Sequence, residues 1–252
     1  AWAEAEKARI GEERFRREHE CEFLIFDETL ISSLVLADME GTAPVENTGQ
    51  VRWFKRPTPG NTYLTSLDPS MGTGGDYAAI QVFELPTFEQ VAEWHHNQTP
   101  MNQQVRILQG INKHIHDTIM EKDATASPHI FYSMENNSIG EAALMRVMDI
   151  GEENIQGMFL SEPIRKGHRR KFRRGFNTTA KHKIDACTKF KELVENDKMK
   201  IHSQLLISEL KDFVASGMSY SAKPGQHDDL VSSCLLMTRM MKVLADFDPK
   251  IF

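Results

Sequence analysis

Two apolar runs separated by a glycine-rich turn constrain the fold of this chain more than any other stretch. The first run, residues 63–67, ends on Asp68, and the second, residues 77–83, follows directly after Asp76. Between them lie one proline and three glycines, which are hairpin-turn residues. No Gly-Lys-Ser/Thr follows and the next run reads as a strand, so the glycines do not form a phosphate loop. The stretch predicts two buried strands joined by a turn.

Asp68 therefore leaves the end of a buried strand just where the turn begins. An ionised carboxylate is costly to bury unless it is paired or binds a metal. Alternatively, an aspartate can start a turn by accepting hydrogen bonds from its own backbone. The residue alone leaves both interpretations open.

The composition is that of a soluble globular protein, with 40% hydrophobic and 26% charged residues among 252. This length suits one large domain or one domain with a small addition. We find no apolar run long enough to span a membrane and no signal-peptide pattern. The three cysteines are widely spaced and lack metal-ligand spacing, which favours reduced thiols and a cytoplasmic setting.

The order of predicted elements indicates a mixed sheet. A further strand is expected over residues 90–96, followed by a helix over 101–120 and a strand over 130–134. Later helices are expected over residues 138–148, 178–195, 205–213 and 228–244, and shorter strands over residues 21–26, 51–55 and 199–201. Consecutive strands followed by strand and helix alternation predict an α/β fold with helices on both faces of the sheet.

Two prolines and a glycine interrupt the chain at residues 56–61 and suggest a boundary. We expect residues 1–60 to be an N-terminal segment or hinge without a core of its own. Residues 61–252 then form the main domain.

Carboxylates recur at the ends of predicted elements. Asp68 and Glu135 each follow a strand, and Asp228 and Asp229 open the last helix. Each has a simpler explanation, because Glu135 can be a solvated strand end and either aspartate can cap a helix. Strand ends and the start of a packed helix can also converge at one edge of such a sheet.

A converging set would need a cation. Two carboxylates about 4 Å apart repel by roughly 4 kcal/mol at an effective dielectric constant near 20. Carboxylate oxygens suit Mg²⁺ or Mn²⁺, and two such ions can cleave a phosphodiester. His227 precedes the aspartate pair and could assist the metal or a phosphate, although packing or capping is an equal alternative.

The charge distribution favours nucleic acid although the net charge is −6. Residues 165–183 contain no acidic residue and nine basic ones: Arg165, Lys166, Arg169, Arg170, Lys171, Arg173, Arg174, Lys181 and Lys183. Phenylalanines interleave with them, and such a segment could reach over a duplex by contacting phosphates without reading sequence. A solvated loop is the alternative.

Three ordered motifs resemble the nuclease domain of tailed-phage large terminase subunits. They are Leu67-Asp68-Pro69-Ser70 with the glycines up to Asp76-Tyr77, then Glu135-Asn136-Asn137 with Gly140, and then His227-Asp228-Asp229-Leu230. The resemblance spans residues 63–241 and implies an RNase H-like fold of the resolvase/integrase superfamily. Residues 11–19 and 30–32 also resemble the segment that leaves the family's ATPase domain.

The resemblance implies a metal-dependent endonuclease that cuts concatemeric viral DNA to start and end packaging. Asp68, Glu135 and Asp229 match the family's catalytic metal-binding acids, while Asp228 and Asp76 match acidic positions beside them. Lys181 and Lys183 match basic positions near the family's active-site groove.

The resemblance also implies partners. They are double-stranded DNA, an ATPase motor domain, the portal and the small terminase subunit. The expected location is the host cytoplasm, with no membrane partner and no secretion. The chain carries no P-loop signature, so we expect it to be an excised nuclease domain. Two alternatives stay open: a Holliday-junction resolvase or integrase-type nuclease, and a non-catalytic module that grips DNA or docks on the portal.

Overall fold

The computed structural model describes residues 2–20, 28–163 and 174–247, which contain a seven-stranded mixed sheet. The strand order is β1-β2-β5-β4-β3-β6-β7. The strands are β1 (Glu46–Thr48), β2 (Val51–Trp53), β3 (Thr62–Asp68), β4 (Ala78–Leu85), β5 (Glu89–His96), β6 (His129–Met134) and β7 (Met158–Phe159). β6 and β7 run parallel to their neighbours, and the other pairs are antiparallel.

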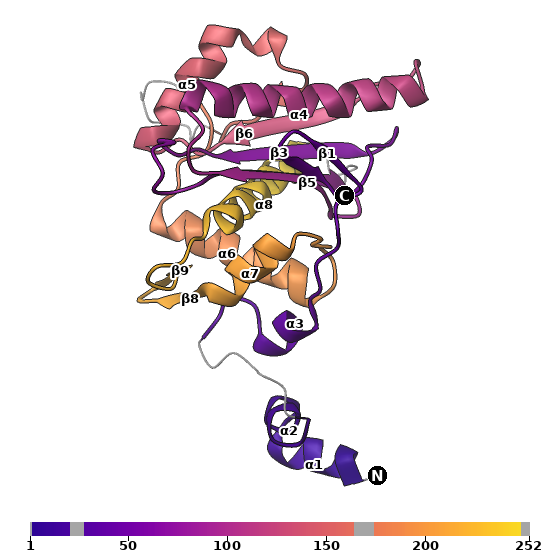
Figure 1. Ribbon diagram of the computed structural model, residues 1–252, viewed down its shortest axis with the longest axis vertical. Helices are drawn as coiled ribbons and strands as arrows, with labels where there is room; N and C mark the ends of the chain where they lie inside the picture. The colour runs from indigo at the N-terminus through magenta and orange to yellow at the C-terminus, as the bar shows by residue number, and fades with distance from the viewer. Residues whose placement is uncertain (1, 21–27, 164–173, 248–252) are drawn as a thin grey trace.

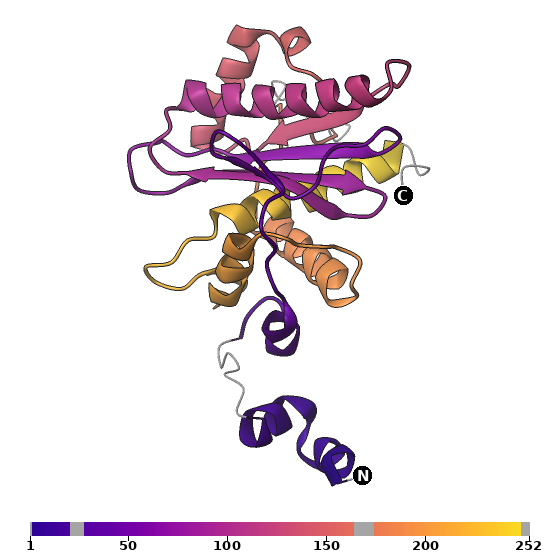
Figure 2. The same cartoon turned by 45° about the vertical axis from the view of Figure 1, so that its right-hand side comes forward.

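Helices cover both faces of this sheet, as Figures 1 and 2 show. One face carries α4 (Met101–Lys122) and α5 (Ser138–Ile150). The other carries α6 (Ala180–Glu195), α7 (Gln204–Asp212) and α8 (Asp229–Phe247). Each face buries its own apolar cluster. The predicted α/β architecture, a mixed sheet with helices on both faces, is therefore confirmed.

The predicted hairpin forms the centre of the sheet. β3 pairs with β4 along its whole length, from Thr62 opposite Leu85 to Asp68 opposite Ala79. On its other side β3 pairs in parallel with β6. Six of the seven residues of β3 are buried, and only Asp68 at its end is partly exposed. The central position of β3 thus carries Asp68 to the middle of one sheet edge.

Residues on both sides of the expected boundary at 56–61 contribute to the sheet and to its apolar clusters, and the division itself stays a prediction. β2 pairs with β5 and extends the sheet, and Leu30, Ile31 and Leu36 are fully buried in the cluster that contains α6 to α8. The pairing of β2 with β5 joins residues about 40 positions apart in sequence. That residues 1–60 continue from a motor domain stays a prediction.

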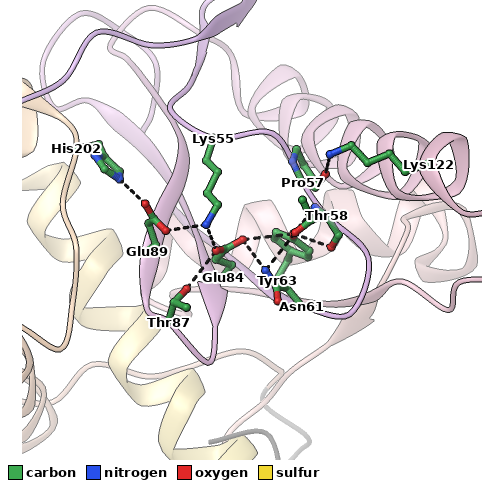
Figure 3. A network of polar contacts seen from close by, with 10 residues as sticks. All are labelled: Lys55, Pro57, Thr58, Asn61, Tyr63, Glu84, Thr87, Glu89, Lys122 and His202. Carbon is green, nitrogen blue, oxygen red and sulfur yellow. Dashed lines mark hydrogen bonds and ion pairs between the residues drawn. The ribbon is translucent and has the colours of Figure 1, made fainter.

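A polar network fixes the same region to the sheet (Figure 3). Lys55 donates hydrogen bonds to Glu84 and, at 2.7 Å, to Glu89. Asn61 donates to Glu84 at 2.9 Å, and His202 contacts Glu89 at 3.0 Å. Glu84 is fully buried, so losing these partners would leave an uncompensated charge inside the protein. Residues 55–61 are thereby held to β4 and β5.

Several short elements differ from expectation. Residues 199–201 form no strand, because only Lys200 bridges Glu89, while Met199 and Ile201 are buried in the core. Asn137 rather than Ser138 caps α5. No sequence signal predicted β7 or the hairpin of β8 (Phe213–Ser216) and β9 (Ser219–Ala222). The strand expected over residues 21–26 lies outside the described residues.

The remaining elements lie in the N-terminal part and after α5. They are α1 (Trp2–Ile10), α2 (Glu12–His19), α3 (Ser33–Asp38) and the 3₁₀ helix η1 (Glu152–Asn154). Arg16 of α2 pairs with Asp38 at the end of α3 at 2.7 Å. Within the described ranges, no helix combines the length and apolarity needed to cross a membrane.

Candidate active site

Parallel pairing brings Asp68 and Glu135 to the same edge of the sheet. Leu67 and Met134 lie opposite each other in β3 and β6, so the residues that follow them leave neighbouring strand ends. The Glu135 amide donates to the Leu67 carbonyl at 3.3 Å. Both carboxylates are partly exposed. The side-chain amide of Asn137 donates to Glu135 at 3.1 Å.

The start of α8 adds Asp228, which directly precedes the helix, and Asp229, its first residue. The Ala222 amide donates to Asp228 Oδ2 at 3.3 Å, and the Tyr77 amide donates to Asp229 Oδ2 at 3.4 Å. Within the described contacts, neither carboxylate caps α8 itself, and no hydrogen bond joins the Asp68 carboxylate to its turn. The capping and turn-starting alternatives therefore do not explain these three residues.

The carboxylates share one electrostatic field. Burial raises the pKa of Asp68 well above its ordinary value, and the nearby negative charges of Glu135, Asp229, Asp228 and Glu209 raise it further. Burial also raises the pKa of Asp229 to about 6, against the hydrogen bond from the Tyr77 amide. Such mutual repulsion favours a proton or a cation at this edge of the sheet.

Glu209 of α7 is a member of this acidic group that the sequence interpretation missed. Burial raises its pKa to about 9. It accepts hydrogen bonds from the amides of Leu230 and Val231 at 2.9 and 3.1 Å. A signal existed, because Glu209 lies at helical spacing from the buried Leu206 and beside Leu210 on the apolar face of α7.

Asp76 and His227 flank Asp229. Asp76 is exposed in the turn before β4, and its negative charge contributes to raising the pKa of Asp229. His227 Nδ1 lies 3.6 Å from Asp229 Oδ2, and its ring meets the edge of Tyr77 with centroids 4.9 Å apart. Both residues therefore border the acidic group, as the sequence motif suggested.

A hollow of about 140 Å³ opens beside the carboxylates. Its lining combines acidic, basic and apolar residues: Asp68, Glu135, Thr178, Lys183, Ala186, Ser232, Leu235, Leu236 and Arg239. Lys183 Nζ lies 3.8 Å from Asp228 Oδ2 and 5.4 Å from the centroid of the Phe213 ring. The hollow thus offers negative groups and a cation to the same ligand.

Arg239 holds the chain on either side of residues 164–173. It donates to Thr178 Oγ1 at 2.9 Å and to the Asn177 carbonyl at 3.0 Å. It also donates to Glu162 and lies over the Phe176 ring at 5.2 Å. Glu162 precedes residues 164–173, and the other partners of Arg239 follow them. Arg239 therefore links Glu162 to residues 176–178.

Most of the predicted basic segment lies outside the described residues. Arg169, Arg170, Lys171 and Arg173 lie outside the described residues. Arg174 pairs with Glu152, and its carbonyl accepts a hydrogen bond from Asn136 at 2.7 Å. Lys181 is exposed on the first turn of α6, whereas Lys183 lines the hollow. The structure therefore brings Lys183 and not Lys181 to the acidic group.

The carboxylates around Asp68 are the candidate ligands for a metal ion. Within residues 2–20, 28–163 and 174–247, no three His, Cys, Asp or Glu side chains lie close enough to form a ready ligand set. The groups whose charge reaches Asp68 are nevertheless all carboxylates, and oxygen ligands suit a hard divalent cation. The carboxylate oxygens are therefore suitable ligand atoms for such an ion, although they do not form a complete coordination shell.

The strand order, the helices on both faces and the carboxylates at one edge define an RNase H-like α/β domain. The family model described as Terminase RNaseH-like domain matches residues 65–240. The chain belongs to this family, as the motifs indicated.

Solved structures share the fold. The large terminase nuclease of thermophilic phage G20c superposes with a TM-score of 0.61 at 17% identity, covering 83% of this chain and 96% of that one. The nuclease domain of Thermus phage P74-26 gives 0.56 at 18% identity, with coverages of 80% and 90%. The terminase nuclease domain of human cytomegalovirus gives 0.52 at 13% identity, with coverages of 84% and 94%.

Proposed function

We propose that this domain is the metal-dependent DNA endonuclease of a viral packaging terminase, cutting concatemeric DNA to start and end packaging. The observation that carries the proposal is the convergence of acids from three separate elements beside a hollow that also contains Lys183. Asp68 comes from β3, Glu135 follows β6, and Asp228 and Asp229 open α8. An isolated acidic residue has many uses, but this combination suits phosphodiester chemistry.

Asp68, Glu135, Asp228 and Asp229 would hold Mg²⁺ or Mn²⁺, and we propose two ions. The relatives support a divalent cation, because G20c nuclease structures are described with bound magnesium and cobalt and the cytomegalovirus domain is manganese-soaked. When bound, such ions activate water and stabilise the leaving oxygen of a phosphodiester.

Side chains around the hollow would supply the remaining functions of the site. Asp68 and Glu135 line the hollow and would present carboxylate oxygens to the ions. Lys183 faces this charge and would position a DNA phosphate through its ammonium group, a contact that carries no sequence information. Arg239 is already engaged by Glu162 and Asn177, so it would shape the wall rather than bind DNA.

The fuller biological role is also a proposal. The domain would act on double-stranded DNA in the host cytoplasm, together with a motor domain, a portal and a small terminase subunit. The basic residues Arg169, Arg170, Lys171, Arg173, Arg174 and Lys181 would contact phosphates outside the hollow.

Plasmid cleavage tests the proposal. We expect nicking and linearisation with Mg²⁺ or Mn²⁺, and loss of at least 10³-fold in rate for Asp68→Asn, which removes one anionic oxygen with little change of shape (roughly 4 kcal/mol). Asp185→Asn, on the exposed side of α6, is the matched control and should cut normally. DNA affinity measured in EDTA should stay within about two-fold for both variants.

Each alternative predicts a different result. Cutting that survives in Asp68→Asn would place the chemistry elsewhere. A strong preference for four-way junctions over linear duplex would favour a resolvase. Salt-sensitive binding without cutting by the wild-type domain, also when joined to its motor, would favour a docking module.

A further inference from the structure

Glu209 lies behind the acids that face the hollow. It belongs to α7, its side chain is 10% exposed, and it does not line the hollow. A carboxylate in such a place needs compensating partners, because burying an unpaired charge is costly. The groups that contact the Glu209 carboxylate therefore indicate its role in the structure.

One oxygen of Glu209 holds the start of α8. Glu209 Oε2 accepts from the amides of Leu230 and Val231 at 2.9 and 3.1 Å. The first amides of a helix have no partner within the helix. Asp228 and Asp229 bond instead to Ala222 and Tyr77, so the cap of α8 comes from another helix.

The other oxygen faces His95, a histidine whose side chain is 13% exposed. His95 Nε2 lies 3.7 Å from Glu209 Oε1, and no hydrogen bond from the described residues reaches this nitrogen. The His95 ring stacks on Tyr77 with centroids 4.1 Å apart, and the Tyr77 amide donates to Asp229. Glu209 thus contacts the first turn of α8 directly, and His95 contacts both Glu209 and Tyr77.

We infer that Glu209 is a positioning residue for the nuclease site: its carboxylate, backed by His95 and Tyr77, fixes the first turn of α8 so that Asp228 and Asp229 point toward Asp68. The inference rests on the proposed function. Acids that repel one another separate unless the backbone that carries them is held. Groups that orient metal ligands from outside typically change metal affinity or activity by about 10–100-fold when removed.

Two substitutions of Glu209 distinguish its role as a hydrogen-bond acceptor for α8 from the effect of its negative charge. Glu209→Gln keeps an oxygen that can accept from the two amides, whereas Glu209→Ala removes it. Glu195→Ala is the matched control, because Glu195 also accepts a backbone hydrogen bond, from Ser32 at 2.7 Å. Glu195 ends α6, about 18 Å along the helix from Lys183 at 1.5 Å per residue.

The variants are compared in plasmid cleavage, in Mn²⁺ binding followed by electron paramagnetic resonance without DNA, and in DNA binding in EDTA. We expect Glu209→Ala to lower kcat and Mn²⁺ affinity by about 10–100-fold with KM for DNA within two-fold. Glu209→Gln should recover most of both, and Glu195→Ala should match the wild type. Circular dichroism and melting curves set a temperature at which every variant is folded.

Two results would overturn the inference. One is a folded Glu209→Ala variant with wild-type kcat and Mn²⁺ affinity. The other is a Glu209→Gln variant as impaired as Glu209→Ala, which would show that charge matters and not the cap. Failure of the proposed function itself would be distinct, because then wild type would not cut or Asp68→Asn would cut normally.

Discussion

Replacing Asp229 by Asn should stabilise the protein when no metal is bound. Burial raises the pKa of Asp229 from 3.8 to about 6, and the side chain is only 14% exposed. The folded state therefore holds a proton that the unfolded chain releases as pH rises from about 4 to about 6. The free energy of unfolding falls over this range by about 3 kcal/mol, at 1.36 kcal/mol per pKa unit.

Asn has no such titration and can still accept the hydrogen bond from the Tyr77 amide. At pH 8 in EDTA we expect Asp229→Asn to unfold about 6–12 °C above the wild type, given roughly 2–4 °C per kcal/mol for a chain of this size. At pH 4 the two melting temperatures should agree. Differential scanning calorimetry at both pH values gives the comparison, with Asp185→Asn as the control.

Magnesium should reverse the order. An ion at 1,000 times its dissociation constant stabilises the wild type by about 4.1 kcal/mol, which exceeds the advantage of about 3 kcal/mol that the variant has in EDTA, and the variant has lost a ligand. The reasoning is refuted if Asp229→Asn melts below the wild type at pH 8 in EDTA. It is equally refuted if the difference between the two proteins is the same at pH 4 and pH 8.

Two further predictions concern the hollow. Arg239→Ala should lower the free energy of unfolding by about 2–3 kcal/mol in urea titrations, because Glu162 loses a charged donor; a change under about 0.5 kcal/mol would contradict this. Lys183→Ala should weaken DNA binding and reduce the slope of log affinity against log salt by about 0.9, whereas Lys189→Ala should not. An unchanged slope for Lys183→Ala would mean that its ammonium, 3.8 Å from Asp228, contacts no phosphate.

The sequence predicted the centre of the fold well because its signals there are local. Buried strands such as β3 and β4 are continuous apolar runs, and the turn between them carries its own glycines. Long amphipathic helices such as α4 show their period directly. Elements of two to four residues, such as β7, β8 and β9, were missed because so few residues carry no period. The pairing of β2 with β5 likewise had no local signal, because it joins residues about 40 positions apart.

The sequence alone also determined which acids to consider. Asp68, Glu135 and Asp229 stand at the ends of elements within ordered motifs, and their positions follow from parallel pairing of β3 with β6 and from the start of α8. Residue type and spacing suffice for this step, because strand ends that share an edge lie close together.

Only the tertiary structure decided what surrounds those acids. Glu209 reaches the start of α8 from a different helix, and His95 reaches Glu209 from β5. Neither contact has a sequence motif, because each joins residues more than 20 positions apart through packing. The same holds for Lys183, which lines the hollow while Lys181 faces solvent. Local sequence patterns identify the acids. The packing of α6, α7 and α8 on one face of the sheet determines the electrostatic environment and orientation of these acids.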